Sequence, residues 1–595
     1  MPYTFVALKV HNAVIYTERV GFDIPNHRQE ITDRNGHTST YEYNAKGYVT
    51  RKEDPDGNIT QWTYNENGDK LSETDALGNA RYWTHDASGN MLSETDALGN
   101  TISYTYNGKN DLLTQTDPNG NMTTNVYDSL GNLTEKTDSM GNTTTYTHDT
   151  NGNVLTETDA IGNMTEYEYN FYGHRTKEIA PNGKVTDWTF DRYGNELSES
   201  VTRTTDTGET VTMTTTNTYD IRNRPTRTVD PMGNITRTEY NHLDKESVVI
   251  DKNGAETLFE YDNNGNQTAI HYADGTSMLT AYDAEGNRTS TTDRAGRTTN
   301  FEYDKNSQMT DVIHPDGSSS EMVFNDAGRM VSTIDENGNQ TQFLYDDAGR
   351  RTTVIDALCN TVSFGYDTAG NQESITDPKG ATTTYAYDGL NRQTKTIYPD
   401  GTFSATGYNE LGRKVSETDQ SGNATLFGYD VAGNLTTVTD ALGNLTQYTY
   451  DEMGNRLSHT DPNNKTETWT YDHLGRQSSH ILPLGMSESW AYGPAGNMTS
   501  HTDFNGDTVL YEYSPCCGRL TLKTYTDGST VEYTYLGDGK RETVTDSQGL
   551  TQYFYDNRGR LASVTDPDGS LISYTYDATA NRPPVTVHSG TTTYK

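Results

Sequence analysis

Short stretches in which every second residue is apolar or aromatic recur along most of the chain, and polar turns separate them. The unit that follows Gly89 is representative, since it reads NMLSET, then DALG, then NTISYTY. Alternation with a period of two predicts β-strands with unlike faces. Asp at the first turn position caps the backbone and Gly at the fourth accepts a positive φ. Each unit is therefore expected to form two strands of about 5–7 residues and two tight turns.

The octapeptide SETDALGN occurs twice, at 72–79 and at 93–100. Its acidic and amide groups could form a duplicated metal or catalytic site, or they could belong to a recurring structural unit. The turn chemistry favours the structural interpretation, because the Asp opens a turn that the Gly completes. The residues that we assign to such turns are Asp75, Gly78, Asp86, Gly89, Asp96 and Gly99.

An aromatic residue or a His ends every second predicted strand. Aligned on this anchor, from Tyr43 to Tyr576, the chain contains 26 units, and all but three spacings are 21 residues. The residue two positions earlier is aromatic in 20 of the 26 units. One face of every second strand therefore carries paired rings, which neighbouring units are expected to stack into a ladder. Representative ladder residues are Tyr41, Tyr43, Trp62, Tyr64, Tyr104, Tyr106, Tyr448, Tyr450, Trp469 and Tyr471.

Tight turns on alternating edges predict an all-β fold, a long antiparallel meander. At about 4.8 Å per strand, two strands per unit give a strip on the order of 250 Å long. A sheet of that length twists and does not stay flat. We therefore expect it to spiral into a hollow shell, complete or partial. A propeller is the main alternative, but its four-stranded blades would alternate every 42 residues, and the sequence shows no such alternation.

The array is predicted to span residues 31–581. It follows an N-terminal segment, residues 1–30, that could cap or plug one end, and it precedes a degenerate partial repeat at 582–595. From Phe190 to Tyr219 the spacing is 29 residues, eight more than the period. An even extension preserves the facing of every side chain. Residues 196–219 thus predict a long hairpin whose turn, Thr205–Gly208, protrudes beyond the rim.

Composition agrees with a wall that has two wetted faces and little solid core. Only 31% of residues are hydrophobic, and Tyr outnumbers Phe by 42 to 13. The formal charge of −39 argues against binding to nucleic acid. No apolar run approaches the ~20 residues of a membrane span. The first residues lack a basic segment before their apolar stretch, so no signal peptide is visible.

Units such as YTYDEMGNRLSHTDPNN, FEYDKNSQMTDVIHPDGS and YFYDNRGRLASVTDPDGS resemble the YD repeats of the RHS family. That family includes bacterial RHS polymorphic toxins, the B and C components of Tc toxins, wall-associated proteins and teneurins. The resemblance implies a β-cocoon that encloses an effector polypeptide for toxin delivery or intercellular competition. It also implies a secreted or cell-surface location.

The sequence departs from the toxins of that family at one point. Their repeats are followed by a segment ending in a motif like DPxGLxGG, where self-cleavage releases the effector. Here every Asp-Pro pair belongs to a repeat turn, and none is followed by Gly-Leu. We therefore expect a shell that lacks the effector and the cleavage segment, with an effector polypeptide or a missing shell segment as its partner.

Candidate chemistry is scarce. The turns contain oxygen ligands suited to Ca²⁺, but none follows the EF-hand spacing. The carboxylates recur in most units, so turn formation explains them, and no unique Ser, His and Asp grouping appears. Cys516 and Cys517 are adjacent and could bind a soft metal or switch redox state, although variant turn residues are the simpler interpretation. We expect no catalysis, no cofactor and no metal site.

Two functions remain open. One is the non-catalytic container, and the other is a cell-surface adhesion or carbohydrate-binding module, because exposed rings such as Trp62, Trp83 and Trp188 could stack on sugars. A closed lumen would favour the first and an open groove lined by these rings the second. Open sheet edges also predict self-association.

Overall fold

The computed structural model describes residues 3–6, 19–204, 210–579, 581 and 586–587, and these form one antiparallel sheet of 55 strands. Each strand pairs with the strands before and after it in the chain. The pairing runs from β1 (Tyr3–Val6) with β2 (Arg19–Asp23) to β54 (Leu571–Ser573) with β55 (Thr586–Val587). The described helical structure is a single 3-10 turn, Ile24–Asn26. The predicted meander is confirmed.

Long and short strands alternate. In a regular unit, β6 (Ile59–Tyr64) has six residues and ends at the anchor, and β7 (Lys70–Thr74) has five. The extended hairpin consists of β19 (Glu196–Thr204) and β20 (Thr210–Tyr219), with 9 and 10 residues. Its tip, which the sequence predicts to protrude, lies outside the described residues.

The ends of the chain add to the same strip where they are described. At the N-terminal end, β2 pairs with β3 (Arg28–Thr32), which pairs with β4 (Thr38–Tyr43), the first long strand of the array. At the other end, β55 is the described part of residues 582–595. The strip therefore begins before residue 31.

Nearly every described unit contains two turns of one geometry. The exceptions are the turn at 514–518, which is one residue longer, and the two-residue turn between Asp546 and Gly549. At Asp75 the Gly78 N–H donates to the Asp75 carbonyl over 3.0 Å, and the Asp75 N–H donates to the Asn79 carbonyl over 3.0 Å. The Asp75 carboxylate accepts from the N–H groups of Leu77 and Asn79, and Gly78 has a φ of 90°. This is a type I turn closed by a left-handed residue. We call the turn after a long strand a YD turn and the turn after a short strand a TD turn.

Cys359 occupies the position of the turn glycine with a φ of 63°, and it is exposed. A left-handed conformation costs an L-residue roughly 1–2 kcal/mol, whereas Gly adopts it freely. We expect Cys359→Gly to raise the free energy of unfolding of the surrounding units by about 1 kcal/mol, part of the gain being lost to the entropy of the unfolded Gly. Urea denaturation followed by circular dichroism measures it. The matched variant Cys359→Ala, which keeps a Cβ, should show no such gain.

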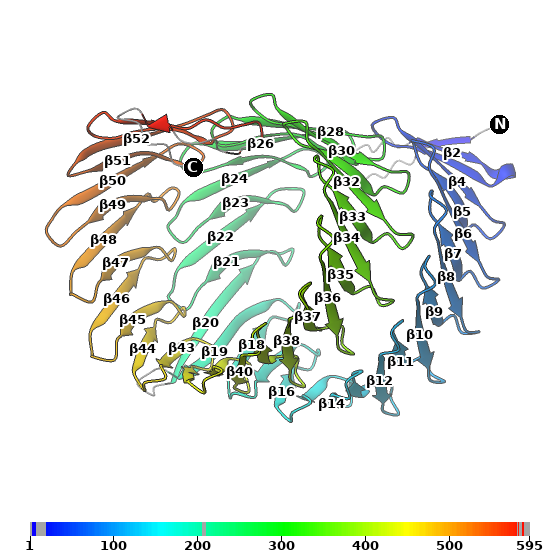
Figure 1. Cartoon of the computed structure of the whole chain (residues 1–595), viewed down its shortest axis with the longest axis horizontal. Helices are drawn as coiled ribbons and strands as arrows, with labels where there is room; N and C mark the ends of the chain where they lie inside the picture. The colour runs from blue at the N-terminus through cyan, green and yellow to red at the C-terminus, as the bar shows by residue number, and fades with distance from the viewer. Residues whose placement is uncertain (1–2, 7–18, 205–209, 580, 582–585, 588–595) are drawn as a thin grey trace.

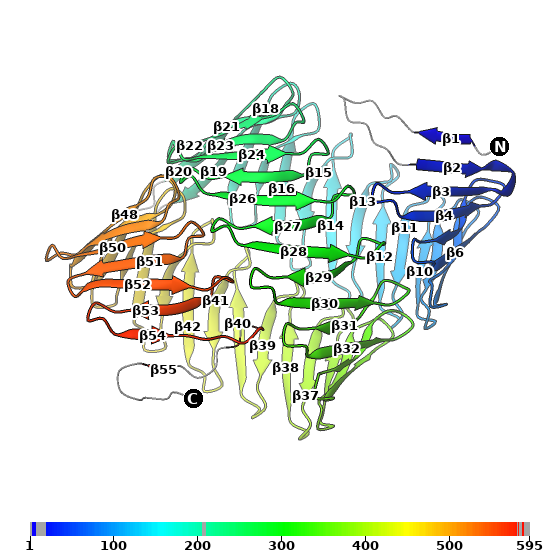
Figure 2. The same cartoon turned by 90° about the horizontal axis from the view of Figure 1, so that it is seen from above.

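The strip winds into a spiral of about two coils. In Figure 1 it descends on one side, passes beneath, rises, crosses the top and descends and rises again. Figure 2 shows the second coil lying beside the first. Strands that mark this path are β12 (Met122–Tyr127), β21 (Pro225–Val229), β26 (Ser277–Tyr282), β32 (Gln340–Tyr345), β38 (Phe403–Tyr408) and β50 (Thr530–Tyr535).

Successive coils meet along a seam of turns, without backbone pairing between them among the described strands. Apart from the contacts of the long hairpin, the described seam contacts join residues in or next to a TD turn of the earlier coil to residues in or next to a YD turn of the later coil. Arg34 contacts Glu285 over a separation of 251 residues, and Asp56 accepts a hydrogen bond from Asn306 over 250. Arg329 likewise donates to Asp75 across 254 residues. One coil therefore takes about a dozen units.

Candidate functional site

The anchor residues and the rings two positions before them lie on one face of the strip, which we call the ring face. A comparison of threonines on the two faces shows that the ring face is the more crowded of the two. In β6, Thr60 on the ring face is partly buried and Thr63 on the opposite face is exposed. The same holds for Thr144 and Thr147 in β14 (Thr143–His148). Crowding of small side chains is typical of the concave face of a curved sheet.

The ladder on this face is interleaved. Long strands are separated by a short strand, so their rings lie about 10 Å apart and cannot stack directly. Each ring lies instead beside the residue opposite it on the next short strand, as Trp62 does beside Glu73. Tyr448 stacks on His459 with ring centroids 5.1 Å apart. The sequence predicted that rings of neighbouring units stack on each other, but a side chain of the short strand lies between them.

The anchor hydroxyls explain why Tyr is preferred to Phe. Tyr345 donates to the Met330 carbonyl over 2.7 Å, and Tyr387 donates to the Gln372 carbonyl over 2.7 Å. In each case the acceptor lies 15 residues earlier, at the start of the preceding short strand. The anchor thus fastens one unit to the one before it. Burial, followed by the nearby Asp367 carboxylate, raises the pKa of Tyr387.

The residues opposite the rings divide the face into three zones. The first zone is mainly acidic, although Gln115 and Lys136 interrupt it, the second is mainly apolar, and the third carries histidines. The acidic zone has Glu73, Glu94, Glu157, Glu178 and Glu199. The apolar zone has Val249, Ile270, Val312, Val354 and Ile375, four of them opposite Phe259, Phe301, Phe343 and Phe364. The third zone has His459, His480 and His501.

In the third zone, histidines and glutamates alternate in a continuous chain. His459 contacts Glu467 at 2.6 Å, and Glu467 contacts His480 at 2.9 Å. His480 contacts Glu488 at 3.0 Å, which contacts His501 at 3.1 Å. Burial opposes ionisation of Glu467, but the hydrogen bonds with His459 and His480 outweigh it and lower its pKa. The strands that carry the chain are β43 (Arg456–Thr460), β44 (Thr466–Tyr471), β45 (Gln477–Ile481), β46 (Ser487–Tyr492) and β47 (Met498–Thr502).

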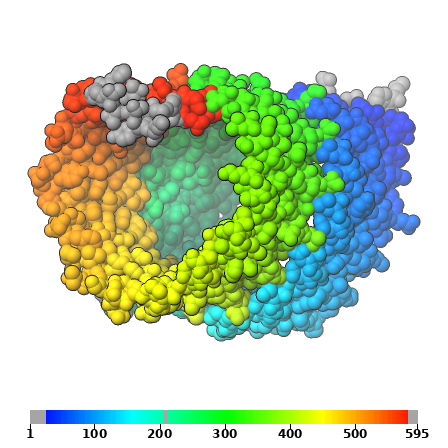
Figure 3. Space-filling view, viewed as in Figure 1, coloured from blue at the N-terminus to red at the C-terminus, as the bar shows by residue number. Residues whose placement is uncertain are grey.

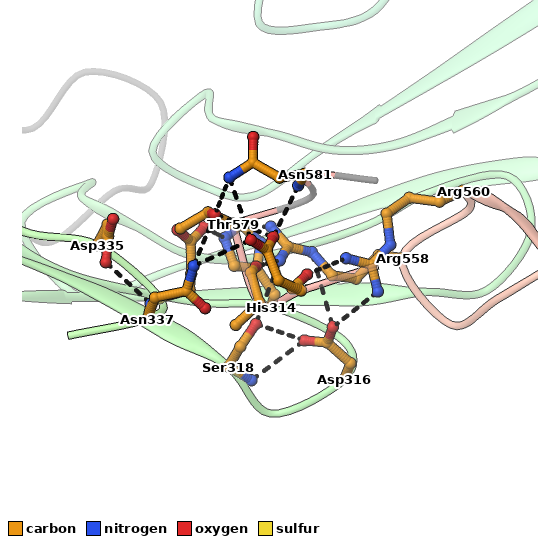
Figure 4. A network of polar contacts seen from close by, with 12 residues as sticks. His314, Asp316, Ser318, Asp335, Asn337, Arg558, Arg560, Thr579 and Asn581 are labelled. Atoms are coloured by element: carbon orange, nitrogen blue, oxygen red, sulfur yellow. Dashed lines mark hydrogen bonds and ion pairs between the residues drawn. The ribbon is translucent and has the colours of Figure 1, made fainter. Parts of the chain in front are cut away.

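Where the last units of the later coil meet the earlier coil, the seam contains a dense network of polar contacts (Figure 4). Arg558 of a YD turn reaches Glu336 at 3.2 Å and Asp316 at 3.8 Å, both in TD turns. Beside it, Asn337 donates to Thr579 over 2.8 Å. The sequence did not predict these partners, because they depend on how many units complete one coil.

The long hairpin inserts a buried arginine into the seam. Arg203 is 5% exposed and donates to the carbonyls of Asp472 and Tyr471 over 3.0 and 3.1 Å. Its Nε lies 3.3 Å from Asp451 Oδ2. The Thr204 N–H donates to the Glu452 carboxylate over 3.1 Å. The eight extra residues therefore carry this hairpin onto the YD turns of the next coil.

Turn aspartates make the fold sensitive to acid. Burial raises the pKa of Asp230, but hydrogen bonds from Lys252 and Asn234 outweigh it and lower the pKa to about 2. Asp538 is similar, with Lys540 and Arg297 as its partners and a pKa of about 2. The unfolded value is about 3.9. A pKa depressed by folding stabilises the protein above pH ~4, and this stability is lost as pH falls through the folded value.

We therefore expect the free energy of unfolding to be steady near neutral pH and to fall between about pH 4 and pH 2. Asp230 alone is expected to contribute about 2 kcal/mol to this fall. Denaturation midpoints measured across the pH range test this expectation. The variant Asp230→Asn should show a smaller dependence of the free energy of unfolding on pH. Asp244→Asn is the control because the Asp244 side chain is 58% exposed. Equal slopes in the two variants would contradict the assignment.

Within the described ranges, no group of three or more His, Cys, Asp or Glu side chains is arranged to hold a metal ion. The Sγ atoms of Cys516 and Cys517 lie 3.4 Å apart, and both thiols are free. Burial raises the pKa of the Cys517 thiol, but hydrogen bonding with Ser514 and Cys516 lowers it overall. None of the described segments is a helix with the length and hydrophobicity of a membrane crossing.

Two family models match the sequence. The RHS Repeat model matches residues 43–80, 85–122, 127–163, 148–185, 408–445, 429–466, 450–485, 471–508 and 555–593. The Teneurin YD-shell model matches residues 216–410. Together they account for most of the chain. No curated protein matches it.

Solved structures of Tc toxin components share the fold. The crystal structure of TcdB2-TccC3-Cdc42 matches with a TM-score of 0.57 and 12% identity, over 97% of this chain and 45% of that one. A structure of the Photorhabdus luminescens Tc holotoxin pore matches with a TM-score of 0.55 and 13% identity, over 99% of this chain and 43% of that one. The chain thus spans less than half the length of these relatives.

Proposed function

The chain belongs to the RHS/YD-repeat family, and on that premise we propose that it is a non-catalytic shell that encloses a polypeptide effector used in toxin delivery or intercellular competition. The observation that carries the proposal is the hollow spiral. The space-filling view shows a deep opening framed by the green, yellow and orange parts of the strip, with the blue-green part behind it (Figure 3). A wall with two faces and no solid core is suited to holding something inside.

We assign the ring face to the interior of this shell. The crowding of Thr60 and Thr144 supports this assignment, as does a pocket of about 430 Å³ at the seam that is lined by Lys52, Thr60 and Glu73. The apolar zone then presents Phe and Val side chains to the contents, while the acidic and histidine zones flank it. An unfolded effector would find both apolar and charged surface there.

The partners that follow from this function are an effector polypeptide and a further shell segment. The structural relatives are components of Tc toxin assemblies, which supports a toxin-related role and a secreted or cell-surface location. Glycan binding gains no support from the rings. Lys70 Nζ lies 4.0 Å from the Trp83 ring centroid, and His480 stacks on Trp469 at 4.7 Å, so one face of each ring is occupied.

Protease protection tests the container. An unstructured polypeptide rich in Gly and Ser, with cleavage sites along it, is fused after Lys595. Enclosure predicts cleavage about tenfold slower than for the same polypeptide free in solution, because the wall of the spiral limits the access of the protease to a polypeptide held inside it. Cleavage at the free rate would contradict enclosure.

A matched pair of variants tests which face is inside. Phe301→Asp and Phe343→Asp place charge in the apolar zone and should speed cleavage of the fused polypeptide. Phe403→Asp and Phe554→Asp place the same charge on the opposite face, where the side chains are 43% and 49% exposed, and should leave the rate unchanged. The reverse result would put the ring face on the outside.

A further inference from the structure

The seam leaves one row of turns uncovered at each end of the spiral. All TD turns lie on one edge of the strip and all YD turns on the other, because the meander alternates edges. The YD turns from 44–47 to 220–223 have no described coil before them, and we call this row the YD rim. The TD turns from 356–359 to 566–569 have no described coil after them, and we call this row the TD rim.

Apolar side chains at the turn tips are far more exposed on the rims than in the seam. In the seam, exposed examples range from Met453 at 38% to Met140 at 52%. On the YD rim, Phe171 is 94% exposed and Ile221 is 101% exposed. On the TD rim, Leu442 is 89% exposed. Further members of the two patches are Leu130, Tyr172 and Tyr193 on the YD rim and Leu358 and Leu484 on the TD rim.

The aromatic part of the YD rim is organised as a patch. The rings of Phe171 and Tyr172 meet edge to face with centroids 5.5 Å apart, and Tyr172 lies 6.4 Å from His174. Arg192 lies over the ring of Tyr193 at 4.5 Å. Clustered aromatic and Arg side chains are the groups that dominate protein–protein binding energy.

The charges on the rims match those of the seam. Within the seam, the third residue of two TD turns is an acid that contacts an Arg in or next to a YD turn, as Asp274 does with Arg519 at 3.6 Å and Asp316 with Arg558 at 3.8 Å. Asp400 and Asp527 occupy the same turn position on the TD rim, where the contacts described for them are hydrogen bonds within their own turns. The YD rim supplies cations. These are Lys46, Lys109, Arg192 and Arg222.

We propose that the TD rim of one molecule binds the YD rim of a second copy of this chain, in the arrangement that the seam already shows inside each molecule. The contact would bury Leu442 and its neighbours against Phe171 and Ile221. Because the two rims are different surfaces, the contact is heterologous, and it leaves a free rim at each end for a further copy. The proposal does not depend on what the shell encloses.

The test uses variants that disable one rim each. Leu442→Asp with Leu484→Asp removes the TD rim, and Phe171→Asp with Ile221→Asp removes the YD rim. Sedimentation velocity at 0.15 M salt or above limits repulsion between two chains of −39 charge, since the Debye length is then about 8 Å or less. Wild type should form concentration-dependent oligomers, and each variant alone should stay monomeric. An equimolar mixture should stop at a 1:1 dimer, because each partner retains the rim that the other needs.

Controls separate rim contacts from general loss of apolar surface. Leu344→Asp with Leu510→Asp changes two strand residues that are each 51% exposed, and it should associate as wild type does. Circular dichroism checks that every variant is folded. A wild-type monomer at all concentrations would overturn the proposal and leave the rims to a different shell polypeptide. Dimers of a single variant would overturn the heterologous arrangement.

Discussion

Replacing Arg203 with Ala is expected to lower the free energy of unfolding by about 3 kcal/mol. The substitution leaves Asp451, whose side chain is 1% exposed, without its cation. It also removes the donors to the carbonyls of Tyr471 and Asp472. Removing one partner of a buried pair costs far more than the pair contributes, because the remaining charge stays away from water. Urea denaturation followed by tryptophan fluorescence measures the change, since Trp188 and Trp469 lie on strands close to the contact.

The control is Arg222→Ala. Arg222 pairs with Asp244 at 2.6 Å, but both side chains are more than half exposed. Exposed pairs contribute about 0–1 kcal/mol, so this variant should unfold almost as wild type does. Hydrogen exchange gives a second measurement, because the Arg203 variant should lose protection at residues 451–475 and 196–219 while distant units keep theirs. Equal effects of the two variants would mean that the long hairpin does not hold the seam.

Local structure could be predicted from the sequence because it depends on neighbouring residues. The turn at Asp75–Gly78 follows from the residues of the turn itself, and the strand that ends at Tyr64 follows from alternation. Repetition then made the strand order certain, since each unit can pair only with its neighbours when the turns are this short. The all-β spiralling sheet needed no further information.

The contacts of the seam could not be predicted in this way. Which TD turn meets which YD turn depends on the number of units per coil. That number is set by the small twist between adjacent strands, which accumulates over many strands. Arg203 and Asp451 are 248 residues apart, so nothing in either unit identifies its partner. One signal was available, because the eight extra residues around Arg203 break the period, and a break in a repeat marks a position with a different role.

Among the aromatic residues, Trp469 is expected to contribute most to stability. Replacing it with Ala should lower the free energy of unfolding by about 3–5 kcal/mol. Trp469 is 6% exposed, and the other hydrophobic residue described as buried is the small Ala269. Its ring stacks on His480 at 4.7 Å, and the guanidinium of Arg456 lies 4.1 Å from its centroid. In a wall without a solid core, one buried indole supplies an unusually large share of the apolar burial of its units. Its removal leaves a cavity in β44 and uncovers the His480 that joins two glutamates.

Chemical denaturation of Trp469→Ala followed by far-UV circular dichroism measures this loss. Tyr82→Ala is the matched control, because Tyr82 lies in a long strand, β8 (Ala80–His85), and is 54% exposed on the opposite face. The Tyr82 variant should lose less than about 1 kcal/mol in the free energy of unfolding, since a side chain that stays in water contributes little to folding. The Trp469 variant should also unfold first between residues 445 and 502, because each unit of a repeat array is stabilised by its immediate neighbours. A uniform loss along the chain, or equal losses in the two variants, would show that the ring face is not where these units gain their stability.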